Sequence, residues 1–250
     1  MRLKAERQGD AWILNGEKVF IANGSVAKLF FVRARTDPKV DVKRGTTLFL
    51  VPSDTPGFRS GKVFNKRGWR FYQNAELIFE NARVPHANVV GEVNGGATAR
   101  GGDLSQFGDL ELAANALGVC EAAVELAMRR ARTRRAGDKN VIDQQISQLK
   151  LSEMHMLTEA LRSFVMRTAW ERDRAVARDE QARDFMPALF VTNFSKTVIQ
   201  RVTELNLDIH GAAGGAMDAY ADKLVRDAMI WTHLAGDSVV RMKAIRHLLK

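Results

Sequence analysis

Cysteine is almost absent from this chain of 250 residues, because Cys120 is the only one. A single cysteine excludes an intrachain disulfide. Cys120 lies in an alanine-rich helical pattern, so we expect a buried and unreactive thiol rather than a nucleophile. The histidines show no metal-binding spacing and no Cys/His cluster exists, so we predict no metal site.

Long hydrophobic runs and several familiar motifs are also missing. No run of roughly 18 apolar residues occurs, so we expect no membrane span. The first ten residues contain no apolar segment typical of a secretory signal, which favours a cytoplasmic protein. No Gly-x-Gly-x-x-Gly after a strand, no P-loop and no Ser-His-Asp pattern is evident, which argues against the enzyme classes that those motifs define.

What the chain does have is positive charge, with a formal net charge of +9. Such a balance suits a polyanionic partner, namely nucleic acid, a membrane surface or a phosphate-bearing cofactor. The basic residues are dispersed, and the only dense cluster is the arginine-rich stretch 129–135. Because no zinc-finger, RNP-like or basic-zipper pattern accompanies it, we expect no nucleic-acid partner.

The first part of the chain has the pattern of a β-domain. Four of the five prolines lie at or before Pro85, and runs of β-branched and aromatic residues alternate with turn residues. Asn15-Gly16 inside residues 12–21 predicts a hairpin, because Asn-Gly is the strongest short hairpin signal. Further strands are predicted over 29–35, 46–51 and 75–79. An antiparallel sheet, closed as a barrel or stacked as a sandwich, is expected.

After a glycine-rich hinge at 93–102 the apolar residues recur with helical spacing. Helices are predicted over 110–132, 142–175, 184–210, 217–227 and 237–249. Long helices joined by short turns indicate an up-down bundle of the four-helix type. The predicted fold is therefore α+β and multidomain, with a β-domain over residues 1–95 and a helical bundle domain over 96–250.

Several motifs occur in one order along the chain, and together they resemble the acyl-CoA dehydrogenases. The resemblance covers the whole chain and is carried by these blocks: Asn15–Gly24, Pro52–Gly57, Gly68–Arg70, Glu76–Pro85, Val90–Glu92, Arg134–Gln145 and Arg226–Arg241.

This resemblance implies an FAD-dependent oxidoreductase of fatty acid metabolism. Its reaction is the α,β-desaturation of an acyl-CoA thioester, with proton abstraction, hydride transfer to flavin N5 and an electron-acceptor flavoprotein as partner. It also implies a dimer or tetramer, homo- or hetero-oligomeric, with FAD across a subunit boundary. The family's chains usually begin with a helical domain. Met1 lies just past the segment that follows it, so we expect that domain to be absent here.

The resemblance places Ala235 where the family usually has its catalytic glutamate. A methyl group cannot accept the α-proton of the substrate. The backbone N–H of Ala235 is retained, and a backbone donor at this position can still polarise the thioester oxygen.

Two carboxylates are alternative candidates for the base. Some family members carry the base on the first bundle helix, where this chain has Gly108 followed by Asp109. The alternative interpretation of Asp109 is a favourable charge at the helix N-terminus. Asp237 follows Ala235 by two residues, although we prefer it as the N-cap of the last helix. His233 is a further basic group nearby, more readily explained as a packed or surface side chain.

The cofactor-binding positions implied by the resemblance include several departures. Phe20 replaces a tryptophan that packs on the isoalloxazine, and Ala22 replaces a threonine that donates to the ring. Arg134 fits the arginine that reaches the diphosphate of a neighbouring subunit's FAD, and the alternative is one more solvated arginine at a basic helix end. Asp208 replaces a glutamine, and its carboxylate repels a diphosphate unless a cation or proton intervenes. The candidate set is completed by Gln145, Gly211 and Gly214.

The missing glutamates and the change at Asp208 favour an alternative function. In this alternative the chain is a non-catalytic partner subunit, or a truncated paralogue, of an acyl-CoA dehydrogenase complex. An oxidase or monooxygenase on the same fold is a third and weaker hypothesis.

Overall fold

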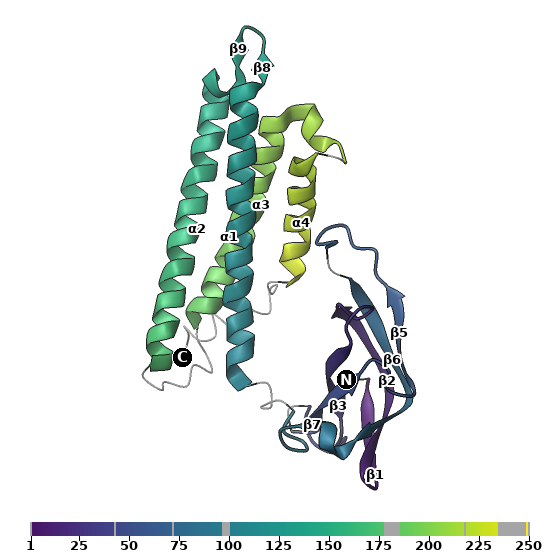
Figure 1. Cartoon of the computed structure of the whole chain (residues 1–250). Coiled ribbons are helices and arrows are strands. Elements are labelled where there is room, and N and C mark those ends of the chain that lie inside the picture. The colour runs from purple at the N-terminus through teal and green to yellow at the C-terminus, as the bar shows by residue number, and fades with distance from the viewer. Residues whose placement is uncertain are drawn as a thin grey trace. The chain divides into compact units, whose positions relative to one another are not determined.

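The chain divides into two compact units, one built on a sheet and one on helices (Figure 1). The sheet unit comprises Met1–Lys66 and Arg70–Gly101, and the helical unit comprises Arg67–Trp69 and Gly102–Lys250. This computed structural model describes residues 2–42, 44–71, 73–96, 101–177, 186–217, 219–234 and 249, without the side chains of 101–109, 186 and 232–234. Each unit is described by itself.

The sheet unit contains one seven-stranded sheet with the order β5-β6-β2-β1-β3-β4-β7. Its strands are β1 (Lys4–Gln8), β2 (Ala11–Ala22), β3 (Leu29–Arg35), β4 (Thr46–Pro52), β5 (Phe58–Val63), β6 (Asn74–Pro85) and β7 (Val89–Val90). All neighbours pair antiparallel except β1 and β3, which are joined by the parallel pair Lys4 and Arg35. The α+β class is confirmed. The described strands form an open sheet with β5 and β7 at its edges, so barrel closure is not seen.

The hairpin predicted at Asn15-Gly16 is wrong, because β2 continues through both residues. The turn lies instead at Gly9 and Asp10, where Gln8 pairs with Ala11. Asn15 makes side-chain hydrogen bonds to Asn81 on β6, at 3.1 Å between the two side chains and 2.8 Å from the backbone N–H of Asn81. A Cβ on Gly16 would lie 2.8 Å from the carbonyl oxygen of Arg2. The Asn-Gly pair therefore forms an irregular position in β2 that lets the preceding chain approach closely.

The helical unit contains α1 (Gly101–Thr133), α2 (Gln145–Ala177), α3 (Met186–His210) and α4 (Tyr220–Leu234). A short hairpin of β8 (Arg135–Ala136) and β9 (Lys139–Asn140) joins α1 to α2. The first three predicted helices are confirmed to within a few residues, except that α1 begins nine residues earlier than predicted. The predicted helix 237–249 lies almost wholly outside the described residues, as does part of the predicted hinge. None of the described helices is long and apolar enough to span a membrane.

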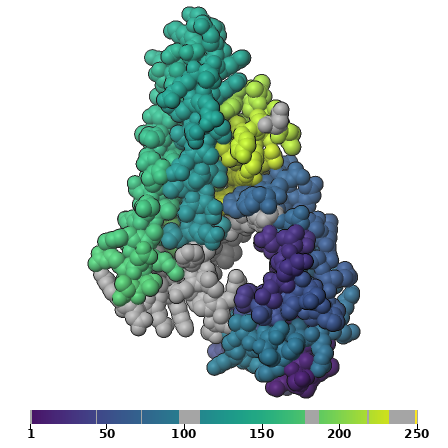
Figure 2. Space-filling view, viewed as in Figure 1, coloured from purple at the N-terminus to yellow at the C-terminus, as the bar shows by residue number. Residues whose placement is uncertain are grey.

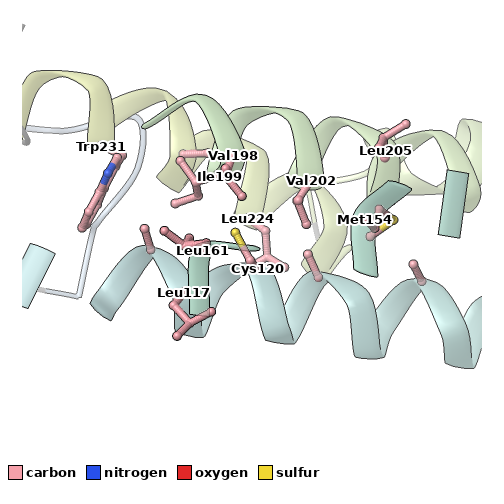
Figure 3. Packing of buried hydrophobic residues seen from close by; sticks show 14 of the residues in the cluster. Leu117, Cys120, Met154, Leu161, Val198, Ile199, Val202, Leu205, Leu224 and Trp231 are labelled. Carbon is pink, nitrogen blue, oxygen red and sulfur yellow. The ribbon is translucent and has the colours of Figure 1, made fainter. Parts of the chain in front are cut away.

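The core of the helical unit is formed by small residues of α1 facing larger ones of the other helices (Figure 3). Buried Ala116, Cys120 and Ala123 let the neighbouring helices approach α1 closely. Leu161 and Ile199 are buried against this face, and burial of each such side chain contributes about 1.5–3 kcal/mol. Burial raises the pKa of Cys120 to about 12. The prediction of a buried thiol is confirmed, and the raised pKa keeps it protonated and unreactive.

Candidate functional site

Two of the motifs that were singled out in the sequence meet in a structural junction. Residues Arg67–Trp69 belong to the helical unit and pack on α4; we call this the loop–α4 junction. The backbone N–H of Trp69 donates to Asp227 Oδ1 at 2.7 Å, and the Trp69 and Trp231 rings lie 5.2 Å apart. A Cβ on Gly68 would lie 2.2 Å from the Arg226 carbonyl oxygen. Only glycine fits there.

The charged residues of α4 in this junction bind each other and the loop. Arg226 donates to Asp222 at 2.7 Å and to the carbonyl of Arg67 at 3.2 Å. Asp227 is buried and also pairs with Lys223. Because both carboxylate oxygens of Asp227 have protein partners, the Arg-Asp pair of the C-terminal motif acts as a scaffold and not as a binding site.

A cleft of about 350 Å³ lies at the end of the helical unit that carries the β8–β9 hairpin. In Figure 2 this end of the unit is the teal surface around the hairpin. Arg130 and Arg134 come from the last turn of α1 and the residue after it, Lys150 from α2, and Asp208 and His210 from the last turn of α3. We call it the basic cleft. With three cations and one carboxylate, and histidine counted as neutral, its lining has a formal charge of +2.

The carboxylate in the basic cleft is not isolated. Lys150 Nζ lies 2.9 Å from Asp208 Oδ2, and this ion pair joins α2 to α3. The Nε of Arg130 is buried and has no hydrogen-bond partner among the described residues. A buried donor without an acceptor is costly, and Arg130 is also one of the cations that line the cleft.

Two glycines shape the chain beside the cleft. Gly211 has φ +63° and ends α3, because a residue with a side chain rarely adopts this conformation. Gly214 is buried, and a Cβ there would lie 2.7 Å from the Cβ of His210. Gly211 lines the cleft directly. Gln144 also lines it, whereas the predicted Gln145 is the exposed first residue of α2.

The aromatic candidate of the sheet unit lies at an irregular position of β2. Phe20 has φ +56°, and the register of β2 and β6 shifts between Lys18 and Ile21. Asn74 Nδ2 donates to the Phe20 carbonyl at 2.9 Å and so supports this conformation. The ring is 62% exposed and stacks on Phe64 with centroids 4.0 Å apart. The ring of Phe20 is therefore accessible although Phe64 stacks on it.

Ala22 follows at the end of β2, where it pairs with Asn74 and is exposed. Near these residues a small cleft of about 240 Å³ is lined by Phe64, Lys66, Arg70 and Gln73, among others. Lys62 Nζ lies 5.8 Å from the centroid of the Phe64 ring. The sheet unit thus offers an accessible aromatic ring with cations beside it.

Of the three catalytic candidates, only Asp109 lies among the described residues. Ala235 and Asp237 lie outside the described residues. Asp109 lies more than two turns inside α1, which begins at Gly101. The helix dipole acts within the first turn, so a favourable charge at the helix N-terminus does not account for Asp109.

Sequence reasoning missed three residues of these sites, namely Arg130, Lys150 and Phe64. Arg130 was one arginine in a run, and nothing in the pattern distinguished it from solvated neighbours. The requirement for a cation beside Asp208 could have directed a search to basic residues on the facing helix, where Lys150 lies.

The fold and the clefts together define an α+β protein with a basic cleft in its helical unit and an accessible aromatic ring in its sheet unit. Models of known protein families match most of the chain. Residues 1–82 match the middle domain of acyl-CoA dehydrogenases, and residues 106–249 match their C-terminal domain. The chain therefore belongs to the acyl-CoA dehydrogenase family.

Individual relatives support the assignment. The chain is 31% identical over 250 residues to cyclohex-1-ene-1-carbonyl-CoA dehydrogenase of Syntrophus aciditrophicus (strain SB), covering 100% of this chain and 59% of that protein. It is 33% identical over 248 residues to mitochondrial isovaleryl-CoA dehydrogenase of Pongo abelii, covering 98% and 56%.

A solved structure shows the same fold. The butyryl-CoA dehydrogenase of Megasphaera elsdenii superimposes with a TM-score of 0.90 at 29% identity, covering 100% of this chain and 63% of that one. The chain thus spans 56–63% of the length of these relatives.

Proposed function

We propose that this chain is an FAD-dependent acyl-CoA dehydrogenase-like oxidoreductase that desaturates an acyl-CoA thioester between its α and β carbons. The observation that carries the proposal is the basic cleft, in a chain whose relatives include two dehydrogenases named for CoA thioesters. The electron acceptor that we propose is a flavoprotein. A chain in a solved structure titled for the electron transferring flavoprotein of Acidaminococcus fermentans is 30% identical with a TM-score of 0.91.

Each unit, taken by itself, offers residues that fit one part of FAD. The basic cleft offers Arg130, Arg134 and a formal charge of +2 to a diphosphate. Arg130 has a buried Nε–H that lacks an acceptor among the described residues. In the sheet unit, the exposed ring of Phe20 offers an aromatic surface to the isoalloxazine. When bound, FAD supplies the hydride acceptor.

The proton step depends on residues of this chain that depart from the family. The backbone N–H of Ala235 would donate to the thioester oxygen and so acidify the α carbon. Its methyl group cannot accept the proton, and Asp109 and Asp237 are the carboxylates proposed to do so. We favour Asp109 over Asp237, because the helix dipole does not explain the position of Asp109 inside α1.

A second candidate function follows from the alanine at position 235. In it the chain keeps the fold and the cofactor cleft but is a non-catalytic subunit of an acyl-CoA dehydrogenase complex. The substitution Ala235→Glu separates the two functions. If the base is simply lost, the glutamate restores substrate-dependent flavin reduction to an inactive protein. If Asp109 or Asp237 serves as base, wild type is already active and Asp109→Asn or Asp237→Asn abolishes turnover.

The direct test of the proposal is the visible spectrum of the purified chain after incubation with FAD. We expect bound flavin that is bleached under anaerobic conditions by a panel of saturated acyl-CoA thioesters. Protein that remains colourless at micromolar FAD would refute the flavin-dependent function. Oxygen consumption without a protein acceptor would instead favour an oxidase.

We also propose that the chain forms a homo-oligomer through an exposed apolar stripe on α2. Leu149, Met156 and Trp170 are separated by multiples of seven residues, and Ile146 and Met166 lie about one turn before Leu149 and Trp170. All five are at least 56% exposed. Leu149→Glu should lower the mass measured by analytical ultracentrifugation. Phe31→Glu, at an exposed apolar residue of the sheet unit, is the matched control and should leave the mass unchanged.

A further inference from the structure

We propose that Lys150 makes the basic cleft competent to bind a diphosphate by neutralising Asp208, and that these two residues together set the affinity of the cleft. The inference deepens the proposed function and rests on it for the identity of the ligand. It assigns a role to Lys150, which the sequence motifs did not include.

The geometry places a repulsive group directly in the cleft. Asp208 lies in the last turn of α3, lines the cleft, and has a half-exposed side chain. The C-terminal end of a helix also carries negative partial charge, which adds to the unfavourable potential for an anion. A bare carboxylate here would oppose the attraction of Arg130 and Arg134.

Lys150, on the facing helix α2, neutralises the carboxylate of Asp208. Its Nζ lies 2.9 Å from Asp208 Oδ2, and its side chain is less exposed than that of Asp208. Both residues line the cleft, so the pair presents a neutral surface to a ligand. The two arginines then act on the ligand without opposition.

The same helices provide a control for a purely structural role. Glu153 on α2 and Arg201 on α3 form a second ion pair across the α2–α3 contact, with distances of 2.6 and 2.8 Å. Neither residue lines the basic cleft. If ion pairs between α2 and α3 served only to join the helices, breaking either pair would have the same consequences.

The test is titration of the full chain with inorganic pyrophosphate and, separately, with FAD, at low ionic strength. We expect Lys150→Gln to weaken both ligands about tenfold or more, because Asp208 is then uncompensated. Asp208→Asn should tighten binding about threefold, since Lys150 becomes available to the ligand. The double variant should return to within about threefold of wild type. Arg201→Gln should change affinity less than about twofold, and thermal denaturation of all variants monitors the structural effect.

Each outcome decides the inference. Dependence of pyrophosphate binding on Lys150, with rescue by Asp208→Asn, supports it even if FAD does not bind, and in that case only the flavin function fails. If FAD binds wild type and Lys150→Gln equally, the inference is overturned and the proposed function stands. If neither ligand binds wild type, both are overturned. Equal losses of affinity for Lys150→Gln and Arg201→Gln would also overturn it, because they would indicate only a structural role.

Discussion

The loop–α4 junction and the basic cleft are both built from charged residues of the helical unit, yet their charges are used differently. At the junction, buried Asp227 has protein partners on both oxygens, and Arg226 pairs with Asp222. In the cleft, cations outnumber carboxylates, and Arg130 has a buried donor without an acceptor among the described residues. Satisfied charge marks a scaffold, whereas excess charge around a cleft marks a binding site.

The largest effect is expected from Gly68→Ala in the junction. The added Cβ would lie 2.2 Å from a backbone oxygen of α4, so the loop must shift. We expect the free energy of unfolding to fall by about 2–4 kcal/mol in urea denaturation. Gly118→Ala on α1 is the control, because no described residue outside its own helix backbone lies within 4 Å of a Cβ built there. That variant should gain about 0.5–1 kcal/mol from helix propensity. Equal effects of the two substitutions would contradict the close packing at Gly68.

A smaller loss is expected from Asp227→Ala. The variant leaves the backbone N–H of Trp69 and the ammonium of Lys223 without their acceptor. We expect a loss of about 2–3 kcal/mol in the free energy of unfolding. Asp10→Ala, which removes an exposed ion pair with Arg83, should cause no measurable loss. Equal free energies of unfolding for Asp227→Ala and Asp10→Ala would show that the loop–α4 junction contributes no stability, and would contradict this prediction.

Arg134→Ala should lower the affinity of the basic cleft for FAD without lowering the stability of the protein. Its side chain is exposed and lines the cleft, so its removal costs charge and no buried packing. We expect FAD affinity to fall about threefold to tenfold, and the fall to shrink as salt is added. The melting temperature should not change. A loss of stability comparable to that of Asp227→Ala would place Arg134 in the scaffold instead.

The smallest effect is expected for Cys120, which lies in the hydrophobic core of the helical unit and should not react with a thiol reagent. Burial raises the pKa of its thiol to about 12, so the native protein should resist alkylation at neutral pH. Because the pKa is raised in the folded state, the thiol's contribution to stability is complete below the ordinary thiol pKa. It is then lost as the pH rises toward about 12. Rapid labelling of native protein at pH 7 would contradict the buried position.

Sequence periodicity was sufficient for the long elements. The strand at Leu29–Arg35 was predicted with its observed bounds, and three helices were predicted to within a few residues except at the start of α1. The Asn15-Gly16 hairpin failed because the local turn preference was overridden by contacts with Asn81 on another strand. Long-range partners of this kind leave no signature in a local pattern.

The candidate site was predictable only in part, because contacts between residues far apart in the chain leave no signature in a local pattern. Family motifs indicated Arg134, Asp208 and Gly211, which the structure brings to one cleft. They did not indicate Lys150, because its role depends on a departure at Asp208, 58 positions away along the chain. Similarly, the partner of Phe20 is Phe64, from a segment that showed no motif.

The most direct test of the account is a parallel titration of Arg130→Ala and Asp227→Ala with FAD, below the melting temperature of both. The account predicts that Arg130→Ala loses about tenfold in affinity while its unfolding free energy stays near that of wild type. It predicts the reverse for Asp227→Ala, which should lose stability and retain affinity. If both variants lose both properties, or if Arg130→Ala binds FAD as wild type does, the distinction between scaffold and binding site is contradicted.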